Sequence, residues 1–197
     1  MIARDRGIAL FIAMTTLVAL AFVGIALVRA VTTSLLIGSN LEARRHATLA
    51  ASTAFESGVV ALFESGSIDT TADDVARNYF ASRQSGEDSR GIPRALQSLA
   101  NYPSVAAVID AGDDYHARYV IERLCLAPGA AAVDHCTLSP PSIEAARGAP
   151  PPGEPLRTPY YRITVRIDGP AASATFVQGT LSDTHANPRL AWRVIDE

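Results

Sequence analysis

The sequence predicts an α+β protein in which a long N-terminal helix packs on a small antiparallel β-sheet, with the first half of the helix spanning a membrane. Three observations support this fold class. Residues 7–28 carry no charged side chain, residues 35–63 contain no proline, and residues 161–168 alternate between apolar and polar side chains. The first two indicate a helix that starts in lipid and continues beyond it, and the third indicates a strand with one buried face.

The membrane-spanning segment is expected at residues 8–28. At a rise of about 1.5 Å per residue, a charge-free run of this length matches a hydrocarbon core of about 30 Å. A removed secretory signal peptide is the first alternative, because it too has a basic start, here Arg4 and Arg6, before an apolar core. The apolar run is longer than the usual ~7–15 residues of such a signal, and a helical pattern continues after Val28. We therefore expect a retained single-pass anchor.

The helix is expected to extend from residue 8 to residue 64. Good helix formers dominate residues 41–51, and Phe55, Val59 and Leu62 recur at helical spacing. Gly38 is a predicted weak point, because glycine costs about 1 kcal/mol relative to alanine inside a helix. The glycine within residues 65–67 is a typical helix terminator.

The remaining residues, 65–197, are expected to form one globular domain on the exported side. A helix is predicted to start within residues 69–80, where aspartate and threonine side chains precede apolar residues, and a short helix or turn is predicted at residues 92–102. Strands are predicted at residues 118–124, 161–168, 173–181 and 192–195 from their β-branched and aromatic content. The second and third of these are expected to form a hairpin.

The strand at residues 161–168 has the clearest pattern. Its period of two predicts one face buried in the core and one face in solvent. The buried face is predicted to consist of Tyr161, Ile163, Val165 and Ile167, and the solvent face of Arg162, Thr164, Arg166 and Asp168. Between this strand and the one at residues 118–124, residues 137–159 are rich in proline and are expected to form an extended surface loop.

Cys125 and Cys136 are the two cysteines of the chain. An even count in an exported domain favours a disulfide, and closing a loop of about a dozen residues stabilises a fold by about 3 kcal/mol in the chain-entropy description. A metal site with His135 is an alternative, as are free thiols. The spacing does not fit the short Cys-x2-Cys pattern that is typical of zinc.

The sequence contains no pattern that indicates catalysis. Gly-x-Ser-x-Gly, a phosphate-binding loop and His-Glu-x-x-His do not occur, and the four histidines are scattered along the chain. We therefore predict a protein that is not an enzyme, with no catalytic residues, no cofactor and no metal. The net charge of -3 and the absence of a clustered basic patch argue against nucleic acid as a partner.

The N-terminus resembles a type IV prepilin leader. Residues 1–7 are short and basic and end in Gly7, and the apolar helix starts at once with Ile8. The resemblance implies that prepilin peptidase cleaves between Gly7 and Ile8 and that Ile8 is then N-methylated. Within the pilins, the chain is most similar to the PilX-type minor pilins, on the residues of its N-terminal third and on residues 118–122 and 161–165.

This resemblance implies a pilin-like fold and a structural role in starting or capping a type IV pilus from the inner membrane. The implied partners are other minor pilins of the PilV and PilW types, a PilY-type tip adhesin and the major pilin. Major pilins begin with phenylalanine and carry a glutamate four residues later, whereas this chain has Ile8 and Ile12. The missing glutamate favours a tip or initiating subunit over a repeating one.

Two alternatives remain at this stage. One is a K-type minor pseudopilin of type II secretion, which shares the missing glutamate but usually has a larger globular domain. The other is a generic single-pass sensor or anchor whose periplasmic domain binds a small ligand. The second alternative predicts no processing at Gly7.

Overall fold

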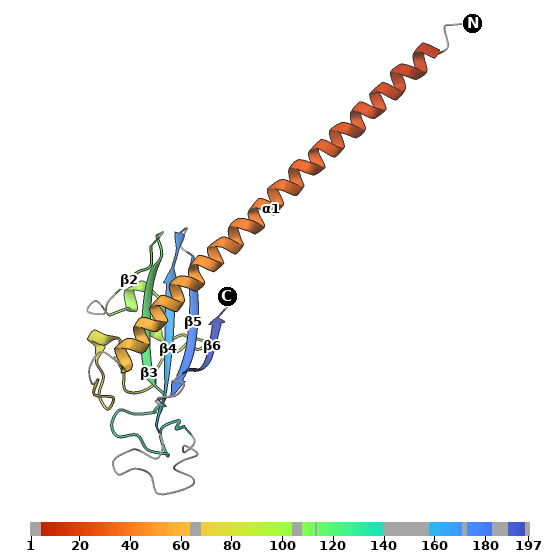
Figure 1. The fold of residues 1–197 in the computed structure, drawn as a ribbon. Helices are drawn as coiled ribbons and strands as arrows, with labels where there is room; N and C mark the ends of the chain where they lie inside the picture. Colours follow the sequence, from red (N-terminus) through yellow and green to blue (C-terminus); the bar gives the residue numbers. More distant parts are fainter. Residues whose placement is uncertain are drawn as a thin grey trace. The chain divides into compact units, whose positions relative to one another are not determined.

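The computed structural model describes residues 5–63, 68–103, 108–112, 114–139, 158–170, 173–182 and 189–195. The chain divides into two compact units, residues 1–46 and residues 47–197. One helix, α1 (Asp5–Phe63), forms the described part of the first unit and is also the first element of the second (Figure 1). The helix begins three residues before the predicted start at residue 8, and its predicted end at residues 64–67 lies outside the described residues.

The second unit contains a sheet of six strands in the order β1-β3-β4-β5-β6, with β2 also paired to β3. The three long pairings are antiparallel, as predicted, but β1 pairs in parallel with β3, so the sheet is mixed. The strand bounds are β1 (Tyr79–Phe80), β2 (Ile109–Asp110), β3 (His116–Arg123), β4 (Tyr160–Asp168), β5 (Ala174–Ser182) and β6 (Arg189–Ile195). The predicted α+β fold class is thus confirmed.

One face of the sheet packs against the last turns of α1. Small side chains let the helix approach closely, and a single core contains Ala51 and Ala54 of the helix together with Ile163 and Val177 of the sheet. The closest approach is at Gly179 of β5, where a side-chain carbon would lie 2.3 Å from the ring of Phe55. Glycine is required at this position because the aromatic ring occupies the space of a side chain.

The opposite face of the sheet was predicted to be in solvent, and this prediction is wrong. Residues 80–102, with the short helices α2 (Arg94–Gln97) and η2 (Leu99–Asn101), cover this face. Ile92 and Leu96 of this cover pack on Val120 and Phe176 of the sheet. Beneath residues 80–102, which we call the cover, the arginines of β4 form ion pairs and hydrogen bonds. The alternation of the strand predicts polar side chains on this face, but it does not show whether they are bonded within the protein or exposed to water.

The helix predicted within residues 69–80 is also absent. Only a single turn forms, η1 (Val75–Arg77), and Asn78 then adopts a left-handed conformation with φ of 59°. This conformation ends the turn. The next residue, Tyr79, is fully buried and pairs with Ile121 in the sheet. The helix or turn predicted at residues 92–102 and the four predicted strands are confirmed.

Candidate functional site

The first unit exposes a long apolar helix surface. Between residues 8 and 41 the only charged side chain is Arg29. The large apolar side chains along this stretch are all more than half exposed, from Ile8 at 60% to Leu41 at 51%. Within the part of the chain that the structure describes, α1 is the one helix long and apolar enough to cross a membrane. A helix of this kind needs lipid or other apolar helices around it.

The hydroxyl side chains on this helix are bonded back to the helix itself. Thr15 and Thr16 donate to carbonyl oxygens three or four residues earlier, at 2.9–3.0 Å. Thr32, Thr33 and Ser34 do the same beyond Arg29. Ser39 donates to the carbonyl oxygen of Leu36 in the same way. An unpaired hydroxyl costs free energy in an apolar medium, so this bonding lets the helix carry these hydroxyls without presenting unpaired donors to an apolar environment.

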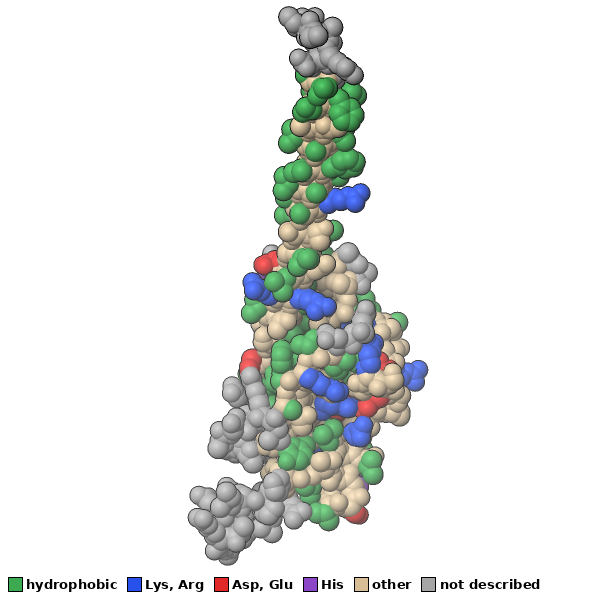
Figure 2. Space-filling view, turned by 90° about the vertical axis from the view of Figure 1, so that its right-hand side faces the viewer, with side chains coloured by type: hydrophobic (Ala, Val, Ile, Leu, Met, Phe, Trp, Pro, Cys, Tyr) green, Lys and Arg blue, Asp and Glu red, His purple; other side chains and the backbone are tan. Residues whose placement is uncertain are grey.

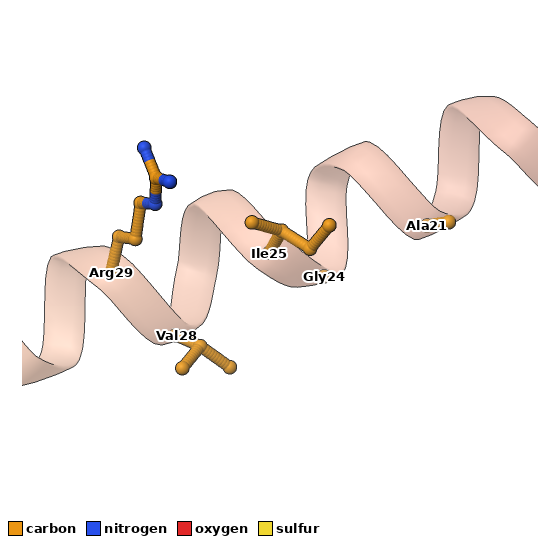
Figure 3. Close-up of a pocket in the computed structure, with 5 residues that line it drawn as sticks. All are labelled: Ala21, Gly24, Ile25, Val28 and Arg29. Carbon is orange, nitrogen blue, oxygen red and sulfur yellow. The ribbon is translucent and has the colours of Figure 1, made fainter.

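A shallow apolar groove lies on one face of the helix. Ala21, Gly24, Ile25 and Val28 line it and Arg29 lies at one end, as Figure 3 shows. The spacing of three, one and three residues places all four apolar residues on one side of the helix. No atom lies within 4 Å of the position that a side chain of Gly24 would occupy. Small residues of this kind allow another apolar helix to approach closely.

The part of α1 that carries a single charged side chain is longer than the hydrocarbon core of a membrane is thick. Residues 8–41 extend over about 51 Å at the usual helical rise. A bilayer core of about 30 Å accommodates about 39 Å of helix, or about 26 residues, even at a tilt of ~40°. If this part of α1 crosses a membrane, at least about eight of its residues lie outside the hydrocarbon core. If Arg29 marks the membrane surface, the uncovered side chains include Leu35, Leu36 and Ile37, each more than 60% exposed.

The structure describes the predicted processing site only in part. Gly7 and Ile8 lie within α1, and the side chain of Ile8 is 60% exposed. Ile12, which stands where major pilins carry a glutamate, is 54% exposed on the same helix. The apolar side chain avoids the free-energy cost of an unpaired carboxylate in lipid. Residues 1–4 of the predicted leader lie outside the described residues.

The predicted disulfide is present between Cys125 and Cys136. It closes a loop of the second unit whose ends pair through a backbone hydrogen bond from Leu126 to His135. The buried guanidinium of Arg123 donates to the carbonyl oxygens of Ala81 and Gly129 and so fixes this loop to the body of the domain. The alternative of a metal site is excluded for these cysteines, because both sulfur atoms are bonded to each other. Most of the predicted proline-rich loop, residues 140–157, lies outside the described residues.

Sequence reasoning missed a buried network of charges beneath the cover of the sheet. Glu122 of β3 is fully buried, and its carboxylate accepts from the guanidinium of Arg162 at 2.6 and 3.1 Å and from the backbone of Gln84 at 2.8 Å. Arg162 also pairs with Glu87 of the cover, and Glu87 pairs with Arg83. The signal in the sequence is weak, because both strands also carry other charged side chains, such as Arg118 and Arg166.

The surroundings shift the pKa values of these carboxyl groups in opposite directions. Burial raises the pKa of Glu122, and the neighbouring Arg162 only partly offsets this effect. For Glu87, burial also acts to raise the pKa, but the hydrogen bond from Arg162 and the charges of Arg162 and Arg83 outweigh it and hold the pKa below 4.5. The bonds of Glu122 and Arg162 to Gln84 and Glu87 join the cover to the sheet.

No protein-family model, curated protein or solved structure was found to match the chain. The features of the chain that bear on its function are the exposed helix surface, the globular domain and the residues of the N-terminus.

Proposed function

We propose that the chain is a minor pilin-like structural protein that helps to initiate or cap assembly of a type IV pilus. The observation that carries the proposal is that exposed large apolar side chains continue on α1 beyond Arg29, at Val31, at residues 35–37 and at Leu41, past the length that a bilayer core covers. A simple membrane anchor has no need for apolar side chains beyond the lipid. A subunit that packs its helix among the helices of other subunits needs them along the whole interface.

Residues 1–8 support the same proposal. The basic residues, the glycine and the immediate start of an apolar helix match what prepilin peptidase processes, and the proposed mature chain starts at Ile8. In this account the helix moves from the inner membrane into a bundle of pilin helices, while the domain of residues 47–197 lies on the periplasmic side. Lipid and a helix bundle are about equally apolar, so the free energy of moving the helix between them depends on how closely the helices pack, for example at Gly24.

The proposed partners are the other minor pilins of the PilV and PilW types, the PilY-type tip adhesin and the major pilin. Ile12 favours a special position at the tip or the start of the filament, because the chain lacks the carboxylate that would attract the terminus of a neighbouring subunit. The same feature fits a K-type minor pseudopilin, which is the second candidate. A pilus and a secretion pseudopilus are distinguished by the partners that co-purify with the full chain.

The experiment that tests this proposal changes the uncovered part of the helix. The full chain is expressed together with the other minor pilins, solubilised in a mild detergent and purified by an affinity tag. A variant with Leu35→Asn and Ile37→Asn is expected to stay in the membrane fraction but to lose most of the co-purifying minor pilins. The matched control, Leu126→Asn and Val133→Asn, changes two exposed apolar side chains of the disulfide loop and keeps the charge unaltered. Equal recovery of partners by the helix variant and the unmodified chain contradicts the proposal.

A further inference from the structure

The two edges of the sheet are built differently. On one side, β3 is flanked by β1 and β2, each of two residues. On the other side the last strand is β6, which has seven residues and pairs only with β5 among the described strands (Figure 1). Proteins usually protect a sheet edge by short strands, prolines, charges or bulges. β6 contains no proline, its charged residues are the two arginines Arg189 and Arg193, and its single irregularity is near its start, opposite Thr180 and Leu181.

The side chains of β6 are suited to recognise an added strand. Trp192 and Val194 lie opposite Gly179 and Val177, so both belong to the face of the sheet on which α1 packs. They are 43% and 39% exposed, which leaves two large apolar side chains at alternate positions of an edge strand. Apolar side chains of an incoming strand would cover them at the same spacing, as in other cases of strand addition.

The charge on the other face of β6 favours an acidic partner. Arg193 lies opposite Gln178, whose side-chain oxygen accepts a hydrogen bond from the guanidinium at 2.8 Å. This bond orients the guanidinium, and no carboxylate of the described residues forms an ion pair with it. A second copy of β6 would bring another Arg193 to the same edge, and like charges across a strand pair are destabilising. A strand with carboxylates at alternate positions has the matching charge.

We propose that β6 is a docking edge for an extended acidic segment of a partner protein, which joins the sheet as an additional antiparallel or parallel strand. Its apolar side chains cover Trp192 and Val194, and a carboxylate on its other face pairs with Arg193. The inference concerns the second unit alone, and it does not depend on the type of filament or complex that the chain joins.

Trp192 is the only tryptophan of the chain, so its fluorescence reports on this edge without a label. The full chain in detergent micelles is titrated with an eight-residue peptide of alternating valine and glutamate. We expect a saturable shift of the emission to shorter wavelength as the peptide covers the indole. The same peptide with lysine in place of glutamate is expected to bind more weakly. A version with N-methylated amides is expected to cause no shift, because it cannot form the hydrogen bonds of a strand.

Two variants test the role of the charge. Arg193→Gln is expected to reduce the affinity for the glutamate peptide about threefold, in the range of a partly exposed ion pair, and Arg193→Glu is expected to reverse the preference between the two peptides. Leu126→Ser, on the disulfide loop, is the control and leaves both titrations unchanged. The proposal is overturned if no peptide shifts the emission or if both charged peptides bind equally. A shift that appears on raising the protein concentration without peptide also overturns it and assigns the edge to a second copy.

Discussion

Glu122 joins parts of the domain that are distant in the sequence, since its carboxylate bonds to β4 and to the backbone of the cover. Replacing one partner of a buried ion pair leaves the other charge buried, which costs about 3–5 kcal/mol. We therefore predict that Glu122→Ala lowers the free energy of unfolding by about 3 kcal/mol, measured by urea denaturation in micelles. The double variant Glu122→Leu with Arg162→Met removes both buried charges and is expected to be more stable than Glu122→Ala, because Glu87 keeps Arg83 as its partner. A double variant as unstable as the single one would contradict this account.

Glu87 gives the domain a dependence on pH. Its folded-state pKa lies below the ordinary value of 4.5, so the unfolded chain takes up a proton at a higher pH than the folded one. The stabilisation is therefore complete above about pH 5 and is lost as the pH falls through the folded pKa. We predict that Glu87→Gln is less stable than the unmodified protein at pH 7 and that the difference shrinks below pH 4.5. Thermal unfolding at a series of pH values measures it, and a difference independent of pH would contradict the prediction.

At the scale of the elements, the packing of α1 on the sheet depends on one glycine. A methyl group at Gly179 would lie 2.3 Å from Phe55, and overpacking of this kind costs about 1–3 kcal/mol. We predict that Gly179→Ala lowers the midpoint of urea unfolding and that Phe55→Leu in the same chain restores part of the loss. Gly38→Ala is the control, because no atom lies within 4 Å of the added carbon. If Gly179→Ala is as stable as the unmodified protein, the helix does not pack as described.

The disulfide is expected to contribute to the stability of the loop that it closes. Its two cysteines are separated by 11 positions, and a closed loop of this size is worth about 3 kcal/mol in the chain-entropy description. We predict that the double variant Cys125→Ser and Cys136→Ser melts at a lower temperature than the unmodified protein. A reductant is expected to lower the melting temperature of the unmodified protein only. A reductant effect of the same size in the double variant would show that the disulfide is not its cause.

The elements that were predicted correctly are those with a strong local pattern. The strand at residues 161–168 follows from its alternation, and the helix through residues 35–63 follows from its composition. The burial of Arg162 was not predictable in this way, because its partners Glu122 and Glu87 are 40 and 75 positions away. The turn at Asn78 was not predicted. The conformation of this segment depends on the left-handed backbone of Asn78 and on the parallel pairing of Tyr79 with β3, and neither feature produces a periodic pattern in the sequence.

At the scale of the whole molecule, α1 belongs to two units that differ in the burial of their apolar side chains. The domain of residues 47–197 has its own core on both faces of the sheet, whereas the apolar residues of the first unit have no core to enter. Figure 2 shows apolar side chains around the far part of α1, with few charged ones among them. The exposed apolar side chains of the first unit are of the kind that lipid or other apolar helices cover.

The long apolar helix and the strands of the sheet were predictable because charge-free runs and alternating strands are local features. The sequence also suggested the processing site, from the residues around Gly7. The open edge at β6 was not predictable, because the order of the strands depends on pairings between distant segments. The same holds for the covered face of the sheet.

The central claim is that the chain is processed and assembled as a pilin-like subunit, and the mature N-terminus tests it most directly. The full chain is isolated from cells with and without prepilin peptidase, and its first peptide is identified by mass spectrometry. The account predicts a peptide that starts at Ile8 with a methylated amino group, and the loss of that peptide when the peptidase is absent. An N-terminus at Met1 in both strains, or one beyond Val28, would contradict the account and leave an ordinary membrane anchor or a secreted domain.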